Sequence, residues 1–245
     1  MWSNYGKNGG SDLEYGGRAG LLYPTMEESP ELRWSFIRKI YSILTIQLIL
    51  TAIVATIVVT VKPITVFFNT TTSGHVLYIV LIIFPIIVLC PLFAYRNRHP
   101  VNYILLAFFT VGISFMVGIP CAFTSGKIIL EAVILTAAVV VSLTLYTFWA
   151  VRRGTDFSFL EPFLFSALIV LLLFGFIQVF FPLGKISQMI YGGLGAIIFS
   201  GYIIYDTNNL IKRFSYDDYI WAAVSLYLDI INLFLALLNI LRATD

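Results

Sequence analysis

Two aspartates stand alone in otherwise apolar stretches near the end of the chain. Asp206 interrupts residues 186–211 and Asp229 interrupts residues 219–241, and neither has a Lys or Arg within four positions. Two carboxyl groups held close together in a dry site resist double ionisation and can share one proton. Carboxylate oxygens are also the preferred ligands of a hard cation such as Ca²⁺. The pair is therefore a candidate proton sensor and a candidate calcium site.

Both aspartates lie on polar stripes of the helices that must carry them. At helical spacing, the stripe through Asp206 contains Gly192, Gly195, Phe199, Tyr202 and Asn209, and the stripe through Asp229 contains Ser225, Asn232 and Ala236. Lipid penalises exposed polar groups, so both stripes are expected to face other helices. The alternative is that each aspartate separately pins neighbouring helices together through hydrogen bonds.

The depth of the two aspartates complicates the idea that they meet. A short connection joins their helices, which predicts antiparallel neighbours. Counted from that connection, Asp229 lies about four or five residues deeper than Asp206, or roughly 6–7 Å at 1.5 Å per residue. Only a tilt or an offset of the helices would remove this difference.

Two glutamates lie at the ends of apolar stretches. Glu131 follows Lys127 by four residues, so the two can pair on one helix face. We interpret Glu131 as an interfacial structural group, and the alternative is a lumenal vestibule carboxylate that takes part in calcium binding. Glu161 begins an apolar stretch and is interpreted as a solvated charge at a helix N-terminus.

The composition indicates that these stretches cross a membrane. The chain has 245 residues, of which 59% are hydrophobic and 11% charged, whereas a soluble domain carries about 25% charged residues. Seven stretches are long enough to span a bilayer, and they predict an all-α bundle of seven transmembrane helices at residues 40–61, 75–94, 101–123, 128–150, 162–182, 187–210 and 219–241. For the last stretch, the alternative is a segment that dips into the membrane and returns.

The rest of the chain offers no separate catalytic unit. Residues 1–32 are polar and Gly/Tyr-rich, which predicts a disordered tail, and residues 33–245 form the membrane domain. Residues 63–74 are expected to be a loop, and its sequon Asn69-Thr70-Thr71 is expected to stay unglycosylated. Nothing indicates nucleic-acid binding, a disulfide, a resident cofactor or an enzyme, and the oligomeric state is left open.

Basic residues alternate between the predicted connections. Nine lie on one side of the membrane and four on the other, and the positive-inside rule makes the richer side, with the N-terminus, cytosolic. In the sixth span, Gly192, Ala196 and Ser200 recur every four residues, which lets helix backbones approach closely. We therefore expect the sixth span to be central in the bundle.

Five segments resemble the Bax-inhibitor/lifeguard family, and its lifeguard branch in particular. Residues 201–207 (GYIIYDT) and 226–234 (LYLDIINLF) are similar to the motifs of its sixth and seventh helices. Residues 36–41 (FIRKIY) resemble the entry to its first helix, and residues 144–148 (TLYTF) and 155–159 (TDFSF) its fourth-to-fifth-helix region. The resemblance covers about residues 30–240.

The resemblance implies a fold and a function. The fold is a central helix surrounded by six others, and the function is a pH-sensitive calcium leak of endomembranes, often the endoplasmic reticulum, that suppresses stress-induced cell death. Asp206 and Asp229 match the family's pH-sensing pair, and cell-death regulatory proteins are implied partners. Bacterial relatives add a basic latch from the second helix, but here Arg96 and Arg98 lie only at the end of that span.

Two other functions are weighed against the leak channel. One is a membrane scaffold that controls cell death through partner binding without conducting ions. The other is an intramembrane aspartyl protease, which also uses two aspartates on adjacent helices. The protease is disfavoured, because Leu226-Tyr227-Leu228 precedes Asp229 where such enzymes carry a Gly-x-Gly segment.

Overall fold

The computed structural model describes residues 22–24, 26–181 and 184–244, and this part of the chain is helical without strands. The helices are α2 (Pro30–Thr60), α3 (Lys62–Thr70), α4 (Thr72–Ala94), α5 (Val101–Ala122), α6 (Gly126–Arg152), α7 (Leu160–Phe180), α8 (Gly184–Lys212), the short 3-10 helix η1 (Tyr216–Asp218) and α9 (Tyr219–Thr244). All except α3 and η1 are long and apolar enough to cross a membrane. The predicted all-α bundle of seven spans is therefore confirmed, and α9 runs through without turning back.

The expectation of a loop between the first two spans is wrong. Residues 63–74 do not form a loop, because Lys62–Thr70 is the helix α3 and α4 already begins at Thr72. The side chain of Thr71 caps α4 by accepting a hydrogen bond from the Gly74 amide at 3.0 Å. Phe68 is buried while Phe67 is exposed, so α3 has one apolar face against the bundle and extends the folded part beyond the predicted span.

The predicted boundary at residue 32 lies inside the folded part of the chain. Residues 1–21 and 25 lie outside the described part of the chain, but the side chains of Leu22 and Met26 are buried against the hydrophobic core. Helix α2 begins at Pro30, where a proline suits the first helical turn. The folded domain therefore includes residues just before the predicted boundary.

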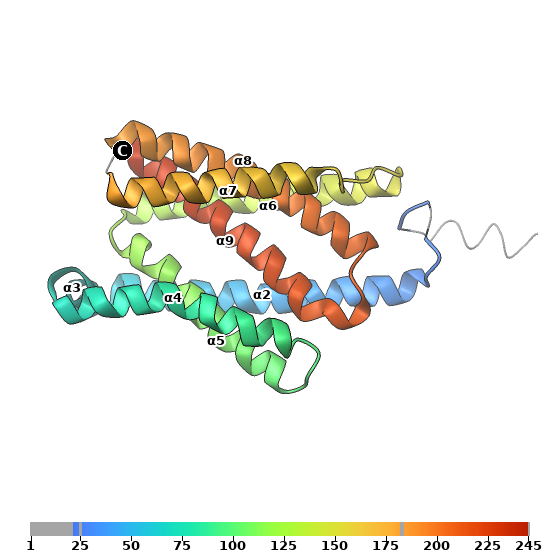
Figure 1. Cartoon of the computed structure of the whole chain (residues 1–245), viewed down its shortest axis with the longest axis horizontal. Helices are drawn as coiled ribbons and strands as arrows, with labels where there is room; N and C mark the ends of the chain where they lie inside the picture. Colours follow the sequence, from blue (N-terminus) through green and yellow to red (C-terminus); the bar gives the residue numbers. More distant parts are fainter. Residues whose placement is uncertain (1–21, 25, 182–183, 245) are drawn as a thin grey trace, which may run out of the picture.

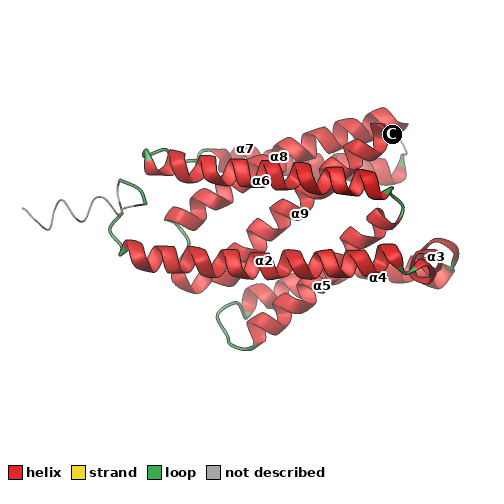
Figure 2. Cartoon of the chain, turned by 180° about the vertical axis from the view of Figure 1, so that it is seen from behind, coloured by secondary structure: helices red, strands yellow, loops and turns green. Residues whose placement is uncertain are grey.

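Helix α9 lies between two groups of helices. Figure 1 shows α2, α4 and α5 on one side of it and α6, α7 and α8 on the other, and Figure 2 shows the same arrangement from behind. Helix α9 packs against α8, α6, α2 and α5, and Ile220, Ala223 and Tyr227 are fully buried. The central helix is thus the seventh span.

The expectation that the sixth span is central is wrong. Small residues on α8 allow a close approach on one face only: a Cβ on Gly192 would lie 2.8 Å from the carbonyl oxygen of Ala236 in α9. The other face carries large apolar side chains that point outward, such as Ile197, which is 72% exposed. Close packing therefore places α8 beside the central helix, not at the centre.

The two ends of the bundle differ in charge. One end, called here the basic end, holds the start of α2 and the connections α4–α5, α6–α7 and α8–α9 (right in Figure 1). The opposite end holds α3, the connections α5–α6 and α7–α8, and the end of α9. The nine basic residues counted above fall at the basic end, and which compartment it faces stays a prediction.

A buried arginine fixes the aspartate-bearing hairpin at the basic end. Arg33 in the first turn of α2 is only 2% exposed; its guanidinium donates to Glu28 at 2.5 Å and to the carbonyl oxygen of Phe214 at 2.7 Å. Tyr216 also donates a hydrogen bond to Glu28. This hydrogen bond, and after it the Arg33 guanidinium, holds the pKa of the Glu28 carboxyl below its usual value, against the effect of burial. The turn between α8 and α9 is therefore tied to α2.

Candidate functional site: a carboxyl pair between the last two helices

Asp206 of α8 and Asp229 of α9 meet in the structure. Their carboxyl groups lie close enough together to interact directly, and Asp229 is only 6% exposed. The depth difference inferred from residue counting is absent. Helix α9 crosses the bundle obliquely (Figure 1), so a residue farther along α9 can lie level with one nearer the end of α8. Sequence reasoning named these two aspartates but left open whether they meet; their role as a proton sensor stays a prediction.

Other members of the two polar stripes behave differently. Asn209 lies near the Asp206 carboxyl, and Tyr202 is close to both aspartates. Asn232 instead donates to the carbonyl oxygen of Leu228 in its own helix at 2.8 Å. Ser225 is half-buried one turn before Asp229. The site proper therefore consists of the two aspartates with Asn209 and Tyr202.

Nearby cations are engaged elsewhere. Lys212 lies 3.8 Å from Asp156 and donates to the carbonyl oxygen of Thr155 at 2.7 Å, while Arg213 lies 3.9 Å from Glu161. Within the described residues, no Lys, Arg or His pairs with Asp206 or Asp229. Two carboxyl groups in contact without a cation can form a hydrogen bond only if one of them carries a proton. The arrangement therefore suits a shared proton.

Asp156 sits in the connection between α6 and α7, outside the spans. Hydrogen bonds from Ser158 and then from Asn208, together with the charge of Lys212, hold the pKa of the Asp156 carboxyl below its usual value, against the effect of burial. Asn208 follows Asp206 by two residues on α8. The loop that carries Asp156 is thereby attached to the same end of α8 as the carboxyl pair.

The oxygen atoms at the pair are a sparse set of metal ligands. Apart from the neighbouring carboxyl, no donor in the described chain reaches Oδ2 of Asp229, and Oδ1 of Asn209 is also buried without a partner. Among the described residues, no three His, Cys, Asp or Glu side chains gather in one place. Ca²⁺ takes about six to eight oxygen ligands, so these residues suit an ion that keeps part of its hydration shell.

Glu131 does not join the aspartates. It lies near the start of α6 at the opposite end of the bundle, 3.8 Å from Lys127, and it is partly exposed. The predicted pairing along one helix face is confirmed. Glu131 therefore lies apart from Asp206, which is near the basic end of α8, and a calcium-binding role for Glu131 stays a prediction.

A second buried polar cluster was missed at the sequence level. It joins α2, α5 and α9 and consists of Gln47, Thr51, Thr110, Ser114 and Tyr227. The hydroxyl oxygens of Thr51 and Tyr227 are 2.7 Å apart, Ser114 donates to Thr51 at 3.2 Å, and Gln47 donates to Thr110 at 3.1 Å. The signal was present in the sequence, since Gln47 and Thr51, like Thr110 and Ser114, are polar residues four apart within apolar spans.

The fold and the site together define a class: multi-pass membrane proteins with a buried carboxyl pair between their last two helices. The comparisons agree with this class. The family model "Inhibitor of apoptosis-promoting Bax1" matches residues 33–245, so the chain belongs to the Bax-inhibitor/lifeguard family. It is 70% identical to Protein LIFEGUARD 2 of Arabidopsis thaliana over 224 residues, which cover 91% of this chain and 94% of that protein.

Two further relatives show how widely the family extends. Protein LIFEGUARD 4 of Arabidopsis thaliana is 67% identical over 96% of each chain. The Golgi anti-apoptotic protein of Vaccinia virus (strain Lister) is 34% identical and covers 89% of each chain. These matches run along nearly the full length, so the resemblance inferred from five short segments is confirmed.

Proposed function

We propose that this protein is a pH-sensitive calcium leak of endomembranes that suppresses stress-induced cell death. The contact between Asp206 and Asp229 is the observation that carries the calcium and proton parts of the proposal. The family description, "Inhibitor of apoptosis-promoting Bax1", supports the cell-death part. The name of the viral relative, Golgi anti-apoptotic protein, supports both the cell-death part and an endomembrane location.

The proposed gate works through the proton that the two carboxyls share. With one proton, the carboxyl of Asp206 and that of Asp229 bond to each other and hold α8 against α9. Loss of that proton leaves two negative charges in a medium of low dielectric constant, where their repulsion is far stronger than in water. The repulsion would separate the helices near the basic end, so calcium flux is expected to rise with pH.

The charges also suit the permeant ion. A gate that gains negative charge as it opens attracts a divalent cation at the moment when passage becomes possible. The neutral side-chain oxygens of Asn209 and Tyr202 would bind the calcium ion together with the two carboxylates. Because the set is too small to replace a full hydration shell, the ion is expected to bind weakly and leave readily.

Calcium flux in liposomes tests the proposal. Purified protein is reconstituted with an entrapped calcium indicator, and the flux is measured across a pH series for wild type, Asp206→Asn and Asp229→Asn. Each variant replaces one carboxyl by an amide that can hydrogen-bond but cannot ionise, so the pH dependence should flatten. Asp217→Asn is the matched control, because Asp217 is an exposed carboxylate in η1, and its pH profile should follow wild type.

The other outcomes separate the alternatives. Wild-type flux with unchanged pH dependence in both aspartate variants would remove the sensor and keep the leak. Absence of flux from folded wild-type protein at every pH would favour the scaffold, in which the pair stabilises a surface for cell-death regulators. The protease has less support, because Asp206 and Asp229 both lie within continuous helices and Leu226 and Tyr227 are buried beside them.

A further inference from the structure

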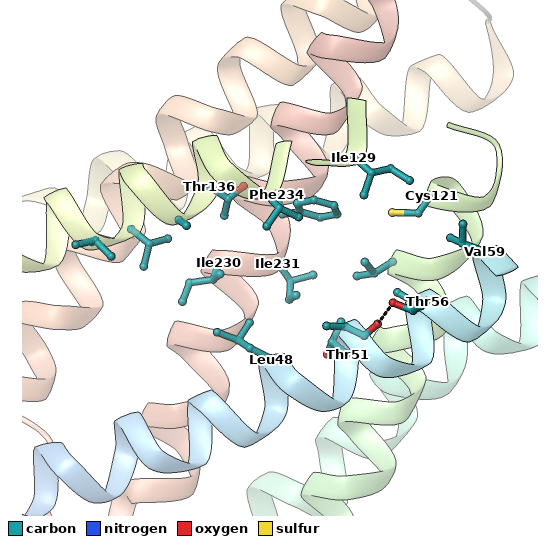
Figure 3. Close-up of a pocket in the computed structure, with 17 residues that line it drawn as sticks. Leu48, Thr51, Thr56, Val59, Cys121, Ile129, Thr136, Ile230, Ile231 and Phe234 are labelled. Atoms are coloured by element: carbon teal, nitrogen blue, oxygen red, sulfur yellow. Dashed lines mark hydrogen bonds between the residues drawn. The ribbon is translucent and has the colours of Figure 1, made fainter. Parts of the chain in front are cut away.

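One cavity lies on the side of α9 that faces away from the carboxyl pair. It has a volume of about 560 Å³ and lies between α2 and α6, with α9 behind it and α5 at one end. Figure 3 shows Leu48 and Thr51 of α2 below it, Ile129 and Thr136 of α6 above it, and Ile230, Ile231 and Phe234 of α9 between them. Cavities of this volume are typical of sites for small molecules.

Small side chains on two facing helices create this space. Ala52, Ala55 and Thr56 of α2 and Thr136 and Ala137 of α6 line the cavity, and their spacing places each set on one helix face. Helices α2 and α6 do not pack closely against each other, whereas both pack against α9. Helix α9 therefore forms the floor between them. The cavity is therefore a groove in the side of the bundle, not a closed void.

The groove opens toward the bilayer. Ala52 and Thr56 on one rim and Val133 and Ala137 on the other are exposed, and they continue into the outward apolar surface that includes Ile53 and Ile134. The surface of a membrane-spanning bundle at this depth is in contact with lipid chains. The groove is thus an inward extension of the lipid-facing surface.

The lining excludes water and ions as regular occupants. Its side chains are aliphatic or aromatic, apart from Cys121 and three threonines, and the hydroxyls of Thr51, Thr56 and Thr136 all bond to carbonyl oxygens of their own helices. A water molecule needs about two to four polar partners to be held in a cavity. Left empty, the walls would forfeit their dispersion contacts. An apolar occupant satisfies both conditions.

The length of the groove matches one hydrocarbon chain. Along α2 it extends from Leu48 to Val59, which is roughly 16 Å at 1.5 Å per residue. The hydrocarbon core of a bilayer is about 30 Å thick, so one leaflet contributes about 15 Å. On α2, α5 and α6 the lining residues lie in the half of the bundle nearer the opposite end. The groove therefore spans the chain region of a single leaflet.

We propose that one acyl chain of a bilayer phospholipid enters this groove between α2 and α6 and packs on α9. The chain comes from the leaflet at the opposite end of the bundle and is buried against Ile230, Ile231 and Phe234. It braces the face of α9 that lies away from Asp229. The proposal does not depend on ion conduction and holds for a leak channel or a scaffold alike.

Photo-crosslinking in lipid nanodiscs tests the site. The full chain is placed in phosphatidylcholine nanodiscs containing a phosphatidylcholine with a photoreactive diazirine on its acyl chain, and adducts are mapped by mass spectrometry. Ile230, Ile231 and Phe234 are buried in the bundle, so an annular lipid that stays outside cannot reach them. Adducts on these three residues are the expected result.

A substitution that fills the groove is the decisive test. Ala137→Trp projects an indole into the groove from its rim, and adducts on the α9 floor should be lost. Ala138→Trp, the next residue on α6, is exposed but does not line the cavity, and it should keep them. Should Ala137→Trp fail to fold, Ala52→Trp fills the groove from α2. Adducts on the outward residues of α7 serve as the internal standard in every sample.

Three results would overturn the proposal. Wild-type adducts confined to outward-facing residues would mean that no chain enters. Floor adducts that persist in Ala137→Trp would mean that the lipid reaches α9 by another route. Rapid reaction of the buried Cys121 with a water-soluble maleimide would mean that water, not an acyl chain, occupies the groove.

Discussion

Helix α9 meets its neighbours through two kinds of polar contact on nearly opposite faces. Tyr227 and Asp229 are two residues apart, which is roughly 200° around the helix. Tyr227 bonds through its neutral hydroxyl to Thr51 of α2, whereas Asp229 meets the carboxyl of Asp206 on α8. The first contact keeps its hydrogen bond at any physiological pH, and the second requires a proton. One face of α9 is therefore anchored and the other can be released.

The difference suggests how a central helix can move without the bundle losing its structure. The neutral cluster of Gln47, Thr51, Thr110, Ser114 and Tyr227 holds α9 to α2 and α5. Helices α6, α7 and α8 form the group on the other side (Figure 2). Separation at the carboxyl pair would then move that group relative to an α2–α5–α9 unit.

The largest expected effect on stability concerns the close approach of α8 and α9. In Gly192→Ala, the added Cβ would lie 2.7 Å from Cγ1 of Ile240 and 2.8 Å from the carbonyl oxygen of Ala236. Because a backbone atom cannot rotate away, the helices must separate, and we expect a loss of about 1–3 kcal/mol in the free energy of unfolding. Unfolding in detergent, followed by circular dichroism, measures this change.

Gly193→Ala is the matched control for that variant. Nothing lies within 4 Å of a Cβ at Gly193, and alanine favours a helix over glycine by up to about 1 kcal/mol. Gly193→Ala should therefore be neutral or slightly stabilising. Equal destabilisation by the two variants would contradict the close contact between α8 and α9.

Tyr227→Phe tests the face of α9 that is anchored by neutral hydrogen bonds. This change removes one hydroxyl, while Thr51 still donates to the carbonyl oxygen of Gln47 and accepts from Ser114. The expected cost is about 1 kcal/mol, typical of a single hydrogen bond. The cost should be the same at every pH, and the pH profile of calcium flux should match that of wild type. A shifted profile would mean that the two faces of α9 are not independent.

The smallest expected effect concerns Glu28 at the basic end. Its pKa is lowered in the folded protein, chiefly by the hydrogen bond from Tyr216, so its contribution to stability is present above its ordinary pKa and is lost as pH falls through the lowered value. Because Glu28 is more than one-third exposed, the contribution is about a few tenths of a kcal/mol. Comparing Glu28→Gln with wild type by thermal unfolding at acidic and neutral pH measures it, and a loss that persists at acidic pH would refute this role.

Sequence patterns located the aspartates but not their surroundings. The stripes through Asp206 and Asp229 follow from helical spacing and from the cost of polar groups in lipid, so their inward direction was predictable. Their meeting depends on the oblique path of α9 and on the geometry of the turn at η1, which residue counting does not include. Residue counting therefore predicted a difference in depth between the two aspartates, and the oblique path of α9 removes it.

The identity of the central helix was unpredictable for a related reason. Small residues on α8 predict that another helix packs closely against it. They do not indicate which of the two helices is surrounded by the rest of the bundle. Helix α9 has larger side chains, such as Tyr227 and Leu233, which are buried because neighbours surround them. The groove between α2 and α6 depends in the same way on which small residues face each other across space.

Infrared spectroscopy of the carboxyl groups tests the shared proton most directly. A protonated carboxyl in a dry site has a carbonyl stretching band that is distinct from carboxylate bands, and it can be followed in reconstituted protein as pH rises. We predict that wild type shows such a band near neutral pH, that it disappears as pH rises, and that Asp206→Asn combined with Asp229→Asn lacks it. A band that is unchanged in the double variant, or no band in wild type at any pH above the ordinary carboxyl range, would contradict the account.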